Sequence, residues 1–183
     1  MTRSPFSWLL LSYVPAVIFL VLGLAGVHLP QPWPYAWHKL LHIFGVVLFL
    51  GNAIVVGLWM SLALHSHKPE LIRFAITTLC WADVCFTGPG FLLTVANGVI
   101  LSQSLAGLYA LPWLRHALLL LALMGLLGMI VMPLQIRMWR LCRTMETEIP
   151  PQLPKLIRQW NLWGALILLP LLAVLALMVI KPG

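Results

Sequence analysis

The sequence predicts an all-α, polytopic membrane protein: one integral membrane domain, a bundle of five transmembrane helices. The first observation is composition, because the chain of 183 residues is 62% hydrophobic and only 8% charged, with a mean hydropathy of +1.00. Soluble domains are about half apolar and about a quarter charged. The second is that five apolar segments each reach the roughly 20 residues that cross a bilayer. The third is that short links join these segments. The expected surroundings are therefore a lipid bilayer.

The five helices are expected at about residues 6–27, 38–64, 75–102, 112–134 and 160–180. The apolar part of the first exceeds the roughly 7–15 residues of a signal-peptide core, so this helix is expected to be retained. Three prolines in the following link predict an irregular cap. In the third span, Pro89 removes a backbone N–H and predicts a kink. The fifth span is almost purely aliphatic and offers no chemistry.

The link after the fourth span begins at Gln135 with the sequence QIRMWRLCR. It predicts a basic helix that leaves the bilayer along the headgroups, until the prolines at 150, 151 and 154 break it. The basic face of this segment could hold anionic lipid, or it could be the ordinary positive charge of a cytoplasmic link.

The charges predict the orientation of the helices. The net charge of +7 comes from eleven Lys and Arg against four acids, and the basic residues lie at the ends of apolar runs, so no nucleic-acid partner is expected. Eight basic residues share the side of the N-terminus, whereas Lys39, Arg115 and Lys181 belong to the other side. Positive residues stay cytoplasmic, which predicts a cytoplasmic N-terminus. Four tryptophans at span ends are expected to form an aromatic belt, namely Trp8, Trp37, Trp113 and Trp160.

Polar residues form one stripe along the third span, at helical spacings of four, three, four and three: Asp83, Thr87, Gly90, Thr94 and Asn97. Such a stripe must face protein or an internal cavity. Asp83 is the only acid within any span, and burying its charge without a partner would be costly. It is therefore either a functional group or a residue that locks helix packing.

The second span carries His42 and Asn52 on one face, and Gly45 on that face leaves room for something flat and bulky. His116 opens the fourth span at a similar predicted depth. Two imidazoles at one depth suit the two axial positions of a haem iron, with Lys39 and Arg115 placed to meet its propionates. The alternatives are that His38 and His42, four apart on a helix, hold copper or zinc, or that these histidines are interfacial hydrogen-bonding groups.

Motifs of soluble enzymes are absent from the sequence. It has no nucleophile elbow, HExxH motif, P-loop or glycine-rich dinucleotide turn. Its three cysteines suggest neither a disulfide framework nor a zinc site. Any chemistry must therefore occur within the bundle or at its faces.

The stretches KLLHIFGVVLFLGNAIVVGLWM, WADVCFTGPGFLLTVANG and PWLRHALLLLALMGLLGMI resemble an uncharacterised bacterial family of predicted integral membrane proteins. More distantly, Lys39-Leu-Leu-His42 is similar to the Lys-x-x-His of HemJ, a bacterial membrane protoporphyrinogen oxidase, and Pro89-Gly90 also looks similar. The HemJ resemblance implies haem b bound through His42, with Lys39 beside it, and a membrane oxidoreductase. The Pro-Arg and Tyr-His of that family are missing here, and Arg115-His116 stand where it has a lysine.

The favoured interpretation is a protein of the bacterial inner membrane that binds haem b and has a redox role. His42 is the first axial ligand and His116 the second, with Lys39, Arg115 and Gly45 around the haem. Asp83 is the candidate catalytic residue, and with Asn52 and Asn97 it would line a polar path for protons. Two alternatives stay open: an accessory or assembly subunit that joins other membrane subunits or its own copies, and a small transporter or ion-pathway protein.

Overall fold

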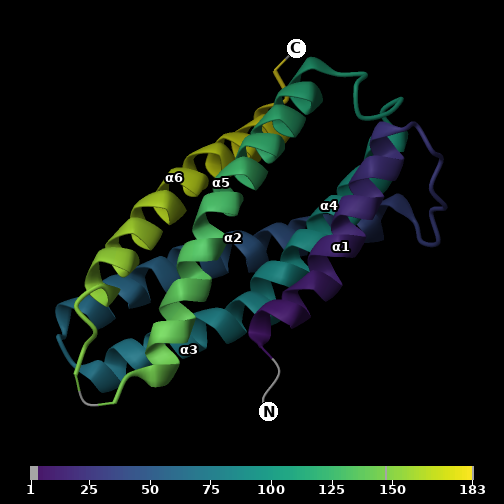
Figure 1. Ribbon diagram of the computed structural model, residues 1–183. Coiled ribbons are helices and arrows are strands. Elements are labelled where there is room, and N and C mark those ends of the chain that lie inside the picture. Colours follow the sequence, from purple (N-terminus) through teal and green to yellow (C-terminus); the bar gives the residue numbers. More distant parts are fainter. Residues whose placement is uncertain (1–3, 147, 183) are drawn as a thin grey trace.

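The computed structural model describes residues 4–146 and 148–182, and these residues contain helices but no strand (Figure 1). The elements in chain order are α1 (Pro5–Leu24), α2 (Tyr35–His65), α3 (Pro69–Ala82), the π-helix η1 (Asp83–Thr87), α4 (Gly88–Gln103), α5 (Pro112–Thr144) and α6 (Leu153–Ile180). Because α3, η1 and α4 run on as one helix, the described chain has five helices long and apolar enough to cross a membrane. The predicted five-helix bundle is confirmed.

The last two helices extend further than the sequence pattern predicts. Helix α5 continues past Gln135 to Thr144 as one helix of 33 residues, so the basic segment after the fourth span is helical, as predicted, and continuous with that span. Helix α6 begins at Leu153, and Pro154 lies in its first turn instead of breaking it. A proline is tolerated there because the first N–H groups of a helix have no intrahelical partner. The expected break therefore lies at Pro150 and Pro151, between α5 and α6, whereas the break expected at Pro154 was wrong and α6 starts before the expected residue 160.

The kink expected at Pro89 takes the form of a π-helical turn, η1. The backbone N–H of Gly88 donates to the carbonyl of Asp83, five residues earlier. A wider turn relieves the clash between a proline ring and the carbonyl four residues before it, so the helix runs on through Pro89. Turns of this kind are frequent at functional sites, and this one begins at Asp83.

The helices pack in two groups, α5 with α6 and α4 with α1 and α2. Helices α5 and α6 form an antiparallel hairpin, and α4 lies between α1 and α2 (Figure 1). The hairpin joins the remaining helices through α6, which packs on α2, and α5, which packs on α3. Helix α4 therefore carries the polar stripe against α2, where the candidate site lies.

Two hydrophobic cores lie at the two ends of the bundle. One surrounds the junction of α2, α3, α5 and α6 and includes Met60, Ile76 and Ile157. The other joins α1 and α4 to the start of α5 and includes Ala16, Val99 and Trp113. Many large apolar side chains outside these cores are exposed on the helices, as a surface covered by lipid tails requires.

Candidate functional site

Helices α2 and α4 touch backbone to backbone at Gly45 and Gly90. A Cβ added to Gly45 would lie 2.7 Å from the carbonyl oxygen of Gly90, and one added to Gly90 would lie 2.8 Å from the carbonyl oxygen of Gly45. No side chain fits in so short a gap. The space that Gly45 was expected to leave for a flat group is filled by helix α4.

A histidine cluster, consisting of His38, His42, Thr94 and Asn97, lies on one side of this crossing. Nδ1 of His38 is 2.8 Å from Oδ1 of Asn97, and Nδ1 of His42 is 2.7 Å from the backbone carbonyl of Thr94. The amide of Asn97 is itself oriented, because its Nδ2 donates to the carbonyl of Leu93 at 2.8 Å. The imidazoles of His38 and His42 are thus both anchored to α4 through Nδ1.

These partners define the tautomer of both rings. A carbonyl oxygen only accepts, so Nδ1 of each histidine carries the proton and donates. In the neutral ring Nε2 then keeps a free lone pair, which is the form in which histidine binds metals, with the other nitrogen held by a carbonyl or carboxylate. Nε2 of His38 is buried and has no hydrogen-bond partner in the described structure.

The imidazole of His42 lies against Gly98 of α4. A Cβ at Gly98 would be 3.1 Å from Cε1 of His42, which is tighter than an ordinary side-chain contact. Glycine at this position therefore lets the ring approach the helix. His42 remains partly exposed, whereas His38 is only 1% exposed.

A second group, the carboxylate cluster, lies on the other side of the Gly45–Gly90 crossing. Oδ1 of Asp83 accepts from Nδ2 of Asn52 at 3.0 Å and from the hydroxyl of Thr87 at 2.8 Å. Oδ2 of Asp83 accepts from Nε2 of Gln135 at 2.7 Å. The indole N–H of Trp160 donates to Oε1 of Gln135 at 3.3 Å. Nδ2 of Asn52 also lies 2.7 Å from the Thr87 hydroxyl.

The carboxylate cluster connects four parts of the fold: α2 through Asn52, η1 through Asp83, α5 through Gln135 and α6 through Trp160. The donors to Asp83 are two amides and a hydroxyl, and no cation is among them. Such an arrangement satisfies a partly buried carboxyl and holds helices in register.

The predicted polar path is divided between the two clusters. Asn52 bonds to Asp83, whereas Asn97 bonds to His38, and the glycine crossing lies between them. The catalytic role predicted for Asp83 stays a prediction. Its neighbours in the structure are groups that orient it.

Three of the predicted haem residues, Lys39, Arg115 and His116, are exposed, and the last two lie on another helix than the histidines of the cluster. Lys39 is on the exposed side of α2, next to the buried His38, and Arg115 and His116 are exposed in the first turns of α5. Helix α5 packs on α6 and α3, whereas His42 faces α4. The structure therefore does not bring His116 to His42 by direct helix packing. No group of three or more His, Cys, Asp or Glu is arranged for a metal within residues 4–146 and 148–182.

Sequence reasoning missed the roles of Gln135 and Trp160. Gln135 was assigned to the link after the fourth span, yet it is 4% exposed and holds Asp83. Trp160 and Trp113 were assigned to the aromatic belt, but both are buried among protein side chains, whereas Trp8 and Trp37 are exposed as expected. The available signal in the sequence was one amide, Gln135, directly after a long apolar run.

Comparison with known proteins identifies one family. Residues 36–182 match the model of a family described as "predicted integral membrane protein (DUF2269)". No curated protein and no solved structure matches the chain. The matched range includes both polar clusters and the helices α2 to α6.

Proposed function

Since this chain belongs to that family of predicted integral membrane proteins, whose description names no activity, we propose from its geometry that it binds haem b through Nε2 of His42. The observation that carries the proposal is the hydrogen bond from Nδ1 of His42 to the carbonyl of Thr94. It leaves Nε2 as a free electron-pair donor on a ring held in place by α4. A proximal histidine that ligates haem iron needs this arrangement.

Of the two other residues of α2 that were proposed at the haem, Lys39 keeps its place and Gly45 does not. Lys39 lies one helical turn from His42 and is exposed, so it remains the proposed partner of a propionate. Gly45 has no place in this proposal, because α4 fills the space beside it.

Haem, when bound, would supply one-electron chemistry, and the resemblance to HemJ makes a porphyrinogen the proposed class of reductant. The same resemblance and the distribution of basic residues support a bacterial inner-membrane location with the N-terminus in the cytoplasm. His116 stays the proposed second axial ligand. It is exposed on α5, and the packing of α2 on α4 does not bring it to His42, so the haem would have to reach His116 in another way.

The visible absorption spectrum of the pure protein from haem-replete cells tests this proposal. We expect a Soret band, and α and β bands after reduction with dithionite. A six-coordinate low-spin spectrum that becomes high-spin in His116→Ala would support His116 as the second ligand. A five-coordinate spectrum unchanged in His116→Ala would leave His42 as the sole axial ligand from this chain. Protein without any Soret absorption would contradict the proposal.

A second candidate is a copper or zinc site that uses His38 and His42. The specific observation is the buried and unpartnered Nε2 of His38, one turn from His42 on the same helix. Metal analysis of the pure protein distinguishes the two. Iron in proportion to haem supports the first proposal, and stoichiometric copper or zinc without haem supports the second.

A further inference from the structure

An open surface cavity of about 490 Å³ lies between the last turns of α5 and the first turns of α6. Its lining combines three cationic side chains with two amides and two leucines: Arg137, Arg140, Lys155, Gln152, Gln159, Leu141 and Leu156. The α5 residues follow a spacing of three and one, and the α6 residues a spacing of three, one and three. Each set therefore lies on one face of its helix, and the two polar faces meet.

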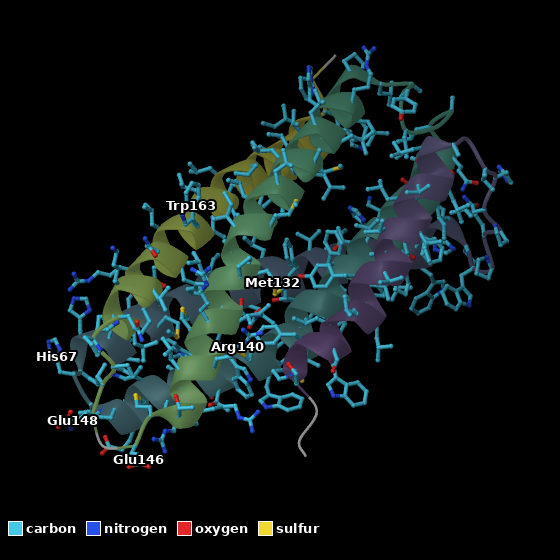
Figure 2. The ribbon with its side chains drawn as sticks, in the orientation of Figure 1. His67, Met132, Arg140, Glu146, Glu148 and Trp163 are labelled. Carbon is cyan, nitrogen blue, oxygen red and sulfur yellow. The ribbon has the colours of Figure 1, made fainter. Side chains whose placement is uncertain are left out.

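The charges of this cavity are of one sign. None of its lining residues is acidic. Figure 2 shows the nearby acids Glu146 and Glu148 on the loop that joins the two helices, at the end of the bundle where His67 also lies. Neither acid lines the cavity, so the two arginines and the lysine form a positive concave surface.

The length of α5 favours a position of the cavity at the depth of the lipid headgroups. With 33 residues, α5 is about 50 Å long, whereas the hydrocarbon core is about 30 Å thick. Its last turns, which contain Arg137 and Arg140, therefore extend beyond the hydrocarbon. Phosphate groups are the anions that occur at this depth in a bilayer.

We propose that this cavity, here called the basic cradle, binds a phosphate group carried by an anionic lipid or by a soluble phosphate compound. Arginine forks form paired hydrogen bonds to phosphate oxygens, and lysine adds a compact positive charge. The two glutamine amides provide further donors at the rim. This site is independent of the proposed haem site, because it lies on a different helix pair.

The test compares two double variants that remove equal charge from the same end of the bundle. Arg140→Gln with Lys155→Gln alters the basic cradle. Arg143→Gln with Arg158→Gln alters exposed cations of the same two helices that do not line the cavity. Native mass spectrometry of the full chain in detergent measures binding of phosphatidylglycerol and phosphatidylcholine, and a parallel titration uses inorganic phosphate and pyrophosphate.

We expect phosphatidylglycerol to bind more tightly than phosphatidylcholine, and the cradle variant to lose at least roughly tenfold in apparent affinity. The control variant should change less than about threefold, because its charges act only at a distance. If inorganic phosphate or pyrophosphate binds the wild type but not the cradle variant, and phosphatidylglycerol shows no preference, the phosphate source is soluble. Equal losses of affinity in both double variants would overturn the proposal. So would a wild type that binds phosphatidylglycerol no more tightly than phosphatidylcholine and binds neither inorganic phosphate nor pyrophosphate.

Discussion

Replacing Asp83 by leucine is expected to destabilise the protein by about 3 kcal/mol, which corresponds to a fall of roughly 10 °C in Tm. The substitution removes the acceptor of Asn52, Thr87 and Gln135 at once. Those donors would lose their shared acceptor in a medium that contains no water, and Asn52 would keep only its bond to the Thr87 hydroxyl. Thermal unfolding of the pure protein in detergent, followed by size-exclusion chromatography, measures this effect.

Two further variants test whether the carboxylate cluster acts as a unit. Gln135→Leu should also be destabilising, because it frees one oxygen of Asp83 and the indole N–H of Trp160. The double variant should cost less than the sum of the single ones, since both remove the same bond. Asn161→Leu is the control: it removes one hydrogen bond, to Ser61, and should cost about 1 kcal/mol or less. An Asp83→Leu protein as stable as the control would contradict a structural role for the cluster.

Replacing Gly45 by valine is expected to separate α2 from α4 and to lower Tm by at least roughly 5 °C. Even the Cβ of the new side chain would lie 2.6 Å from Oγ1 of Thr94 and 2.7 Å from two backbone atoms of α4. Backbone atoms of a packed helix cannot turn away as a side chain does, so the cost is that of overpacking, about 1–3 kcal/mol or more. The separation should also weaken the bond from His42 to Thr94 and hence haem binding.

The matched control for this prediction is Gly51→Val on the same helix. A Cβ at Gly51 meets no atom within 4 Å, so valine should be tolerated there with little change in Tm. The comparison holds the helix, the residue types and the membrane environment constant. Equal stability of the two valine variants would contradict the close backbone crossing.

The positions of the spans could be predicted from the sequence because hydropathy alone determines where a helix crosses lipid. The pairing of Asn52 with Asp83 was also within reach, since each lies on a polar stripe that must face protein. The extent of α5 and α6 was not, because hydropathy falls where a helix leaves the bilayer even though the helix continues. From the sequence alone, Pro154 could equally end one helix or lie in the first turn of the next.

Two features of the candidate site depend on which helices meet, and the sequence does not contain that information directly. The missing side chain of Gly45 shows that something comes close, but a cofactor and a neighbouring backbone leave the same signal. The matching depth of His42 and His116 was a prediction from span positions, and depth does not determine whether two helices are neighbours. The role of His38 emerged only with its bond to Asn97 and its unpartnered Nε2.

The most direct test of the central claim, that His42 ligates haem through Nε2, is the haem content per chain of two matched variants. His42→Ala removes the proposed ligand. His65→Ala removes a histidine of the same helix whose Nδ1 is likewise 2.7 Å from a backbone carbonyl, that of Ser61, at the other end of α2. A pyridine haemochrome assay of the pure proteins should find haem reduced at least about tenfold in His42→Ala and unchanged in His65→Ala. Haem content in His42→Ala equal to that of the wild type, or a wild type without haem, would contradict the claim.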